Sequence, residues 1–353
     1  MAYLTISFSE LNLYEICPFL FKLYISKEKP SDRKRNTLTL KLTMKDILDK
    51  NRASFDNEPD ISPIISASSF GIFKDCKQKF KWRFDGVKES DPVSLTPFMF
   101  GTLVHSKFDT FVAELKNKYG SLRNSNFKEE FKRFYYDKAL NDEVKAYLSK
   151  YLLGDKEIMK EYKAFYKAIT NHYKFIDSIL KQGCEPEFNF WFGNKTTPIN
   201  LDMPEISSLR FVGEIDHFYI NKRGNITIED TKTSSSVYYL NNDQLYLYAF
   251  CLEKYFSNRG QNLKVDELNF NMVRLGKRHS IPFGNTQKIA FISRLSSLQS
   301  CFQVNHFPRT ISKNCVNCQY RTKCSSLNKS VRESELDTFS KQLQQNLLNF
   351  KDI

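Results

Sequence analysis

The sequence has no apolar run approaching the roughly 20 residues that a membrane-spanning helix needs. Its N-terminus also lacks a signal-peptide pattern. No Walker phosphate loop of the form G-x-x-x-x-G-K-[ST] is present, so a helicase motor is not expected in this chain. These absences argue against membrane-spanning and secreted proteins, and we expect a cytoplasmic protein that does not engage a membrane.

The composition is strongly basic. The 353 residues carry a formal net charge of +13, with a pI near 9.2, which favours polyanionic partners, nucleic acid ahead of an anionic membrane surface. Phe and Tyr are unusually common, at 31 and 18 residues. Most should lie in the core, but some could stack on unpaired bases. The length allows one large domain or two smaller ones.

Eight cysteines in an intracellular chain are expected to be reduced thiols or metal ligands rather than disulfides. Cys315, Cys318 and Cys324 cluster near the C-terminus, and a Cys-x-x-Cys knuckle presents both sulfurs to one ion. A four-thiolate site needs one more ligand. Cys76 is the best candidate and Cys17 its rival, and the spacing leaves both zinc and an iron–sulfur cluster open. Three others are expected to be small buried residues, namely Cys184, Cys251 and Cys301.

Residues 1–60 are interpreted as an N-terminal extension, which ends in a polar stretch. It contains ISFSELNLYEICPFLFK, and ISASSFGIFKDCKQKFK follows at a constant offset of 59 residues. Each stretch is typical of a capped helix leading into an aromatic and basic segment. The extension is therefore either a degenerate repeat of 65–82 or a chance similarity, and the sequence leaves the two open.

The order of the expected elements predicts an α/β fold with a mixed sheet flanked by helices. A helix opens at Gly101, and helical spacing of aromatic residues predicts a helical insert over about 121–182. Apolar residues on one face predict a C-terminal packing helix over 331–353. Strands are expected at 185–192, 209–220, 225–232 and 267–274, with helices around 244–251 and 286–302.

The segment from Gly213 to Tyr248 carries the clearest chemical pattern. GEID at 213–216 precedes a hairpin turn at 221–225, and IEDTKT follows at 228–233. Because side chains alternate along a strand, Asp230 and Lys232 point to the same face, roughly 7 Å apart, and Asp216 can meet Asp230 across the hairpin. Two carboxylates beside an ammonium suit a hard divalent cation and a water that loses a proton. The alternative is a surface hairpin with ordinary salt bridges.

Further side chains could complete this site. Gln244 and Tyr248 are one helical turn apart and share a face, although they could also be plain helix surface. His105, on an otherwise apolar helix face, is either a metal ligand or a core histidine. Glu187, which opens the strand before the hairpin, could add a carboxylate.

Together these pieces resemble the PD-(D/E)XK nuclease superfamily. The matching stretches are SASSFGIFKDC at 66–76, GTLVH at 101–105, GEID at 213–216, EDTKT at 229–233, QLYLY at 244–248 and the cysteine triplet. They look most like the RecB-type branch with an iron–sulfur staple, which includes AddB-like nuclease domains and CRISPR-associated adaptation exonucleases. The resemblance implies a restriction-endonuclease-like core and a nuclease domain over 61–330.

The resemblance also implies roles for individual residues. His105, Asp216 and Asp230 would hold catalytic Mg²⁺ or Mn²⁺, and Lys232 would lie beside the attacking water. Gln244 and Tyr248 would position the lysine or the DNA backbone. A [4Fe–4S] cluster would bind the thiolates of Cys76, Cys315, Cys318 and Cys324. One departure is that the family usually has Cys-Pro at its first cluster ligand, whereas here Cys17, not Cys76, precedes proline.

The function that the resemblance implies is metal-dependent hydrolysis of DNA phosphodiester bonds, with exonuclease action expected. The setting would be recombination, repair, replication, or CRISPR or phage DNA processing, with a helicase or recombination protein as a partner. The alternative is a catalytically silent nucleic-acid-binding scaffold with a structural iron–sulfur or zinc site. The intact set of Asp216, Asp230 and Lys232 favours the enzyme, because a silent scaffold needs none of the three.

Overall fold

The computed structural model describes residues 62–89, 96–152, 154–312, 315 and 318–324. The expected N-terminal extension, Cys17 and the C-terminal helix lie outside these residues. The chain divides into two compact units. The first, which we call the sheet unit, contains residues 63–68 and 94–292. The second, the cysteine unit, contains among its described residues 69–89 and those from 293 onward.

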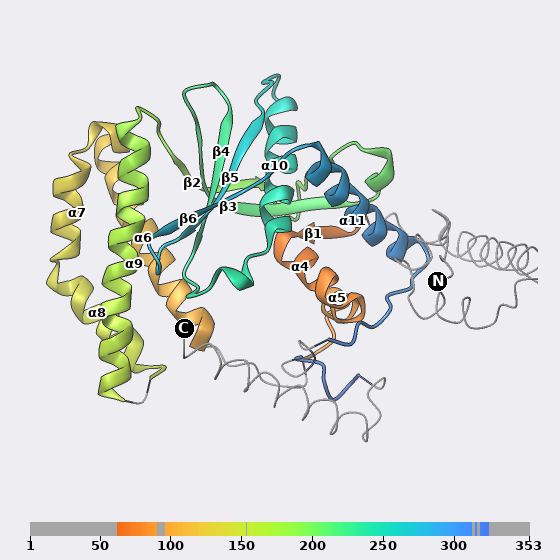
Figure 1. Ribbon diagram of the computed structural model, residues 1–353, viewed down its shortest axis with the longest axis horizontal. Coiled ribbons are helices and arrows are strands. Elements are labelled where there is room, and N and C mark those ends of the chain that lie inside the picture. Colours follow the sequence, from red (N-terminus) through yellow and green to blue (C-terminus); the bar gives the residue numbers. More distant parts are fainter. Residues whose placement is uncertain (1–61, 90–95, 153, 313–314, 316–317, 325–353) are drawn as a thin grey trace, which may run out of the picture. The chain divides into compact units, whose positions relative to one another are not determined.

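The described part of the sheet unit holds a six-stranded sheet with the order β1-β3-β4-β5-β6, and β2 pairs with β3 (Figure 1). Pairs β1–β3 and β4–β5 are parallel, and β2–β3, β3–β4 and β5–β6 are antiparallel. The expected α/β fold with a mixed sheet is therefore confirmed. The strands are β1 Ile64–Ser66, β2 Glu187–Gly193, β3 Arg210–Ile220, β4 Ile226–Lys232, β5 Val265–Met272 and β6 Lys277–Ile281.

Helices cover the sheet and extend beyond it. Helix α10 packs on strands β2 to β5, and α6 and α9 pack on each other, with α7 and α8 on the side of α9 away from the sheet (Figure 1). No helix among the described residues is long and apolar enough to cross a membrane. The helices are α4 Ala67–Asp75, α5 Lys77–Phe84, α6 Thr96–Tyr119, α7 Phe127–Tyr135, α8 Lys138–Ser149, α9 Asp155–Lys181, α10 Asn242–Ser257 and α11 Asn285–Gln303.

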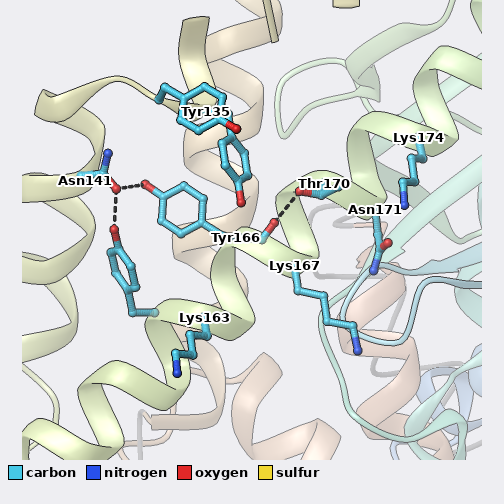
Figure 2. A pocket seen from close by; sticks show the side chains of 10 residues that line it. Tyr135, Asn141, Lys163, Tyr166, Lys167, Thr170, Asn171 and Lys174 are labelled. Carbon is cyan, nitrogen blue, oxygen red and sulfur yellow. Dashed lines mark hydrogen bonds between the residues drawn. The ribbon is translucent and has the colours of Figure 1, made fainter. Parts of the chain in front are cut away.

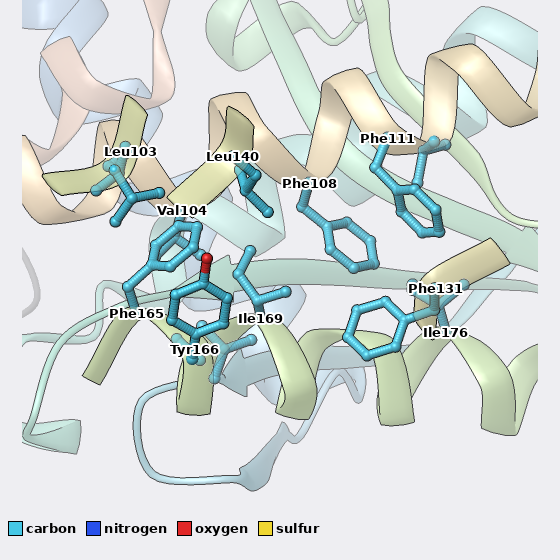
Figure 3. Close-up of a cluster of buried hydrophobic side chains, with 14 of the residues drawn as sticks. Leu103, Val104, Phe108, Phe111, Phe131, Leu140, Phe165, Tyr166, Ile169 and Ile176 are labelled. Carbon is cyan, nitrogen blue, oxygen red and sulfur yellow. The ribbon is translucent and has the colours of Figure 1, made fainter. Parts of the chain in front are cut away.

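The helices of the 121–182 segment share one hydrophobic core with α6. The apolar side chains of α9 recur at helical spacing, so they form a single stripe that meets α6 (Figure 3). Phe165, Ile169 and Ile176 of α9 are fully buried, as are Val104 and Phe108 of α6. This segment is thus an extension of the main core rather than a separately packed appendage.

The hairpin between β3 and β4 turns where the sequence predicts it. The backbone N–H of Asn221 donates to the carbonyl of Asn225 at 2.8 Å. The Asn221 side-chain oxygen accepts from the N–H groups of Arg223 and Asn225 at 3.0 and 3.2 Å. An asparagine that bonds its own turn in this way fixes the hairpin register locally.

The sequence analysis predicted neither strand β1 nor strand β6, and it placed the start of helix α6 too late. Strand β1 is only three residues long, and β6 is an edge strand whose exposed side chains lack apolar alternation. Both exist because they pair with β3 and β5, which sequence periodicity does not reveal. Helix α6 begins at Thr96, so Gly101 lies inside the helix instead of opening it.

The cysteine unit is held by aromatic contacts. Phe80 of α5 contacts Phe302 and Phe307, with ring centroids 5.9 and 6.0 Å apart. Trp82 contacts Tyr320 at 5.4 Å, and the Tyr320 hydroxyl donates to the carbonyl of Val87 at 3.2 Å. These contacts fasten the segment that carries the cysteine triplet against α5.

The shared core predicts a large stability difference between two positions of α9. Phe165→Ala removes a fully buried ring and should lower the free energy of unfolding by about 3–5 kcal/mol. Met159→Ala, at a side chain that is 47% exposed, should change it by less than about 0.5 kcal/mol. Urea unfolding followed by circular dichroism measures both, and equal effects would contradict a core that α9 shares with α6.

Candidate active site

The candidate site lies where the sheet opens beside β3. Strand β3 pairs with β1 only over Arg210–Val212 and with β4 only over His217–Ile220. The intervening residues Gly213–Asp216 pair with β2 alone. Continuing the β3–β4 register would set Ile215 opposite Thr231, but the ladder ends before that point. Strand β3 therefore does not pair with Thr231, and side chains contact the N–H and C=O groups of this residue instead.

Two predicted site residues form hydrogen bonds with the backbone of Thr231 in place of β3. Asp216 Oδ2 accepts the N–H of Thr231 at 2.7 Å. His105 Nε2 lies 3.1 Å from the Thr231 carbonyl, and since a carbonyl only accepts, Nε2 donates this hydrogen bond. A buried peptide group needs such partners. The structure thus brings His105 and Asp216 to the backbone of one residue, Thr231, between Asp230 and Lys232.

Asp230 and Lys232 point to one face of β4, as predicted, and meet Gln244 of α10 there. Lys232 Nζ lies 2.6 Å from Asp230 Oδ2 and donates to Gln244 Oε1 at 3.0 Å. Gln244 Nε2 donates to Asp230 Oδ1 and to the Tyr248 hydroxyl, both at 2.9 Å. Because an ammonium only donates, the amide orientation is set by Lys232. One amide therefore connects the acid, the lysine and the tyrosine.

Burial and charge set the protonation of this group. Asp230 is 1% exposed, and burial raises its pKa to about 6, opposed by Lys232 and reinforced by Asp216. Burial by itself lowers the pKa of Lys232, but Asp230 and Asp216 outweigh it and the pKa is raised. Lys232 is accordingly a cation at neutral pH, suited to stabilising negative charge and not to removing a proton.

Asp109 and Glu214 were missed by the sequence interpretation. Asp109 follows His105 by one turn of α6, and burial raises its pKa to about 6, with His105 opposing and Asp216 reinforcing. Burial and then Asp216 raise the pKa of Glu214. Their spacing in the sequence was the available signal. Asp109 follows His105 by four residues on a helix, and Glu214 precedes Asp216 by two residues on a strand, so each pair shares one face of its element.

Glu187 does not join these carboxylates. It stands opposite Phe218 in the sheet, is 58% exposed, and contacts Lys116 at 3.1 Å. Lys116 lies eleven residues after His105 on α6, about 16 Å along the helix axis. The suggestion that Glu187 adds a carboxylate to the site is therefore wrong.

Comparison with protein-family models identifies the family of this chain. The family model described as the PD-(D/E)XK nuclease superfamily matches residues 64–325, most of the chain. The chain belongs to the PD-(D/E)XK nuclease superfamily. No curated protein matches the sequence. Asp216, Asp230 and Lys232 all lie within the matched residues.

Two glycines allow close approaches around the candidate site. A Cβ at Gly101 would lie 3.0 Å from Thr233 Oγ1, so glycine lets α6 approach the end of β4. A Cβ at Gly213 would lie 2.6 Å from Phe192 Cζ and 3.5 Å from Tyr248 Cε1. Glycine at these positions, in GTLVH and GEID, thus brings His105 and Tyr248 up to the sheet.

The opposite face of β4 is supported by buried polar contacts. Thr231 Oγ1 lies 3.3 Å from His172 Nε2, and the His172 ring stacks on Phe108 with centroids 3.8 Å apart. Glu229 accepts from Asn271 and contacts Arg278 at 3.0 Å. These contacts hold the strand that carries Asp230 and Lys232 from behind.

The donor set fits a divalent cation by its chemistry. Among the described residues, no three His, Cys, Asp or Glu side chains are arranged as a ligand group. Asp230 Oδ2 is buried and has Lys232 Nζ at 2.6 Å, yet burial outweighs this ion pair and keeps the pKa of Asp230 raised. A hard cation would stabilise two carboxylates at this place.

Four predicted cysteines meet in the cysteine unit. Cys76, Cys315, Cys318 and Cys324 all line one small cavity, and none forms a disulfide. Cys76 is the N-cap residue of α5. Burial raises the pKa of Cys318, and the nearby Cys315 and Cys76 thiols contribute to the rise. The thiols expected to be buried small residues are buried, at Cys184, Cys251 and Cys301.

The raised pKa of Asp109 predicts a pH-dependent stability difference. Because its folded pKa of about 6 exceeds the unfolded value, the folded state holds an extra proton between about pH 4 and 6. Stability from this group is present below that window and is lost as pH rises through it. From pH 4.5 to 7.5, the wild type should lose about 1–3 kcal/mol relative to Asp109→Asn.

Urea unfolding with EDTA at both pH values measures this difference. Asp142→Asn, at an exposed position of α8, is the matched control and should show no pH-dependent difference from the wild type. If the difference in the free energy of unfolding between the wild type and Asp109→Asn stayed constant with pH, it would contradict the raised pKa of Asp109.

Proposed function

We propose that this protein is a metal-dependent deoxyribonuclease that hydrolyses DNA phosphodiester bonds. The observation that carries the proposal is the hydrogen-bonded group of Asp230, Lys232 and Gln244 beside Asp216, in a member of the PD-(D/E)XK superfamily. The net charge of +13 supports a polyanionic substrate. Within the superfamily, we propose the RecB- and AddB-like branch and exonuclease action on DNA ends.

Lys232 acts as the fixed positive charge. It is protonated, partly exposed, and held by Asp230 and Gln244, so its ammonium can donate to the attacking water or to a phosphate oxygen as negative charge develops. Gln244 keeps the lysine and the acid in a fixed relation, and Tyr248 supports the amide. These residues are prearranged before substrate binds, which lowers the cost of reorganisation during the reaction.

Asp216, Asp230 and His105 are the proposed ligands of Mg²⁺ or Mn²⁺, with Asp109 and Glu214 as neighbouring carboxylates. The ion, when bound, lowers the pKa of a coordinated water and neutralises charge on the phosphate. The Thr231 peptide orients Asp216 and His105 through the hydrogen bonds described above. The chain's own contribution is therefore to hold its oxygen and imidazole donors in place.

For the cysteine unit we propose a [4Fe–4S] cluster on Cys76, Cys315, Cys318 and Cys324. The common cavity of these four thiols supports a four-thiolate metal site. Such a ligand set suits iron–sulfur clusters and zinc alike. The cluster would fasten the C-terminal segment to the start of α5. DNA recombination, repair, replication or CRISPR or phage DNA processing, with a helicase or recombination partner, is the proposed setting.

Substitutions at two site residues test the activity. Asp230→Ala and Lys232→Ala should each lower the metal-dependent rate of DNA cleavage by about 10²-fold or more, because each removes charge stabilisation used in the transition state. Folding and DNA binding should stay close to wild type. Cleavage of end-labelled single- and double-stranded DNA, with Mg²⁺, Mn²⁺ or EDTA, measures the effect.

Two exposed positions provide controls for these substitutions. Asp142→Ala and Lys222→Ala remove the same charges and should leave the rate unchanged. Full metal-dependent activity in Asp230→Ala or Lys232→Ala would rule out the assigned site. A wild-type protein that binds DNA without cleaving it under any metal condition would favour the silent scaffold.

Cysteine substitutions test the cluster in anaerobically purified protein. Cys318→Ser should abolish bound iron, acid-labile sulfide and absorbance near 400 nm, since it removes one of the proposed thiolate ligands. Cys184→Ala, which changes a buried thiol outside the cavity, should retain all three. Comparison of Cys76→Ser with Cys17→Ser identifies the fourth ligand. Stoichiometric zinc without iron in the wild type would contradict the cluster.

A further inference from the structure

Helix α9 has a lysine stripe along the face opposite its apolar core face. The spacings between successive lysines are four, three, four, seven and seven residues, each close to whole turns of an α-helix, so these side chains share one face. The stripe spans about 37 Å along the axis. Its lysines are Lys156, Lys160, Lys163, Lys167, Lys174 and Lys181.

Three of these lysines line a groove between helices α7, α8 and α9 (Figure 2). Lys163, Lys167 and Lys174 form its basic side, and the groove encloses about 650 Å³. None of the side chains that line it is acidic. Glu161, also on α9, contacts Arg274 at 2.8 Å instead. The groove therefore concentrates positive charge without internal neutralisation, in contrast to an ordinary solvated helix face with mixed charges.

Tyrosine rings form the other side of the groove. Tyr136 is 77% exposed, and its ring meets Tyr135 edge-on at 5.1 Å. Tyr135 in turn packs on Tyr166 at 4.9 Å. Asn141 Oδ1 accepts hydrogen bonds from the hydroxyls of Tyr162 and Tyr166, the latter at 2.7 Å. Tyr166 is buried and Tyr135 and Tyr162 are partly buried, and these packed rings present Tyr136 as an exposed aromatic surface beside the lysines.

We propose that this groove binds a segment of single-stranded nucleic acid. Its phosphates would contact Lys163, Lys167 and Lys174, and an unpaired base would stack on Tyr136. Aromatic rings together with a basic track are the combination that single strands require, because every unpaired base offers a face for stacking. In a duplex the bases are already paired and stacked, so the tyrosine would add nothing. The substrate class assumed here rests on the proposed nuclease function.

Two hydrogen bonds link the groove to strand β4, which bears Asp230 and Lys232. Asn171, which lines the groove, donates to the carbonyl of Val273 at 2.8 Å, and the N–H of Val273 donates to the carbonyl of Lys232 at 3.0 Å. Lys163 lies eight residues from Asn171, about 12 Å along α9. The groove therefore begins two hydrogen bonds away from the strand that bears Lys232, and a strand of several nucleotides can contact both.

Binding measured in EDTA tests the groove without cleavage. The probes are a labelled dT strand of about 30 nucleotides, longer than a site of roughly 4–16 nucleotides, and a duplex of equal length. The combined variant Lys163→Gln, Lys167→Gln, Lys174→Gln should bind the strand at least about tenfold more weakly, and its salt-dependence slope should fall by about 2. The control variant Lys128→Gln, Lys138→Gln, Lys150→Gln removes equal charge from exposed positions of the same helical segment.

Substitutions at Tyr136 separate stacking from charge. Tyr136→Ala should weaken single-strand binding about fivefold or more and leave duplex binding unchanged, and Tyr136→Trp should restore it. Equal losses in the two triple-lysine variants, or equal effects of Tyr136→Ala on strand and duplex, would overturn the proposal.

Cleavage assays distinguish failure of the groove from failure of the proposed function. In Mg²⁺ or Mn²⁺, the groove variant should lower kcat/KM for the long strand at least about tenfold, but should cleave a dinucleotide, which is too short to occupy the groove as well, as the wild type does. Groove-dependent binding by a wild type that never cleaves DNA would overturn only the nuclease proposal. Normal cleavage with unchanged binding in the groove variants would overturn only the groove.

Discussion

The early end of the β3–β4 ladder is the constraint on which the site depends. A regular antiparallel pair would satisfy the Thr231 peptide with backbone groups of β3. Here Asp216 and His105 satisfy it instead, at 2.7 and 3.1 Å. A buried peptide cannot be left without partners, so these side chains are drawn to one point beside Asp230. The gap in β3–β4 pairing and the convergence of Asp216 and His105 on Thr231 thus have the same cause.

Burial of charge is the second constraint. Asp230 is almost fully buried, and this burial raises its pKa, with the nearby Asp216 adding to the rise. The ammonium of Lys232 offsets part of this cost, and the Gln244 amide spans both partners. A buried charged group of this kind stabilises the fold less than an apolar core would.

Helix α9 contributes to the hydrophobic core, to the support of strand β4 and to the lysine-lined groove. Its apolar stripe packs on α6, which places His105, and His172 supports Thr231 from behind. Its lysine stripe faces the groove formed with α7 and α8. A single 27-residue helix therefore helps to position the strand that bears Asp230 and Lys232 and also presents the basic surface proposed to hold substrate.

The sequence by itself determined the features that follow from local geometry. Alternation along a strand placed Asp230 and Lys232 on one face, helical spacing paired Gln244 with Tyr248, and Asn221 set the hairpin turn. Only the tertiary structure decided that β1 and β6 join the sheet, that Asp109 and Glu214 lie near Asp216, and that Glu187 does not. It also decided that Cys76 shares a cavity with the cysteine triplet and that Tyr136 stands beside the α9 lysines. Such contacts join residues far apart in the chain, and they depend on packing that no local period encodes.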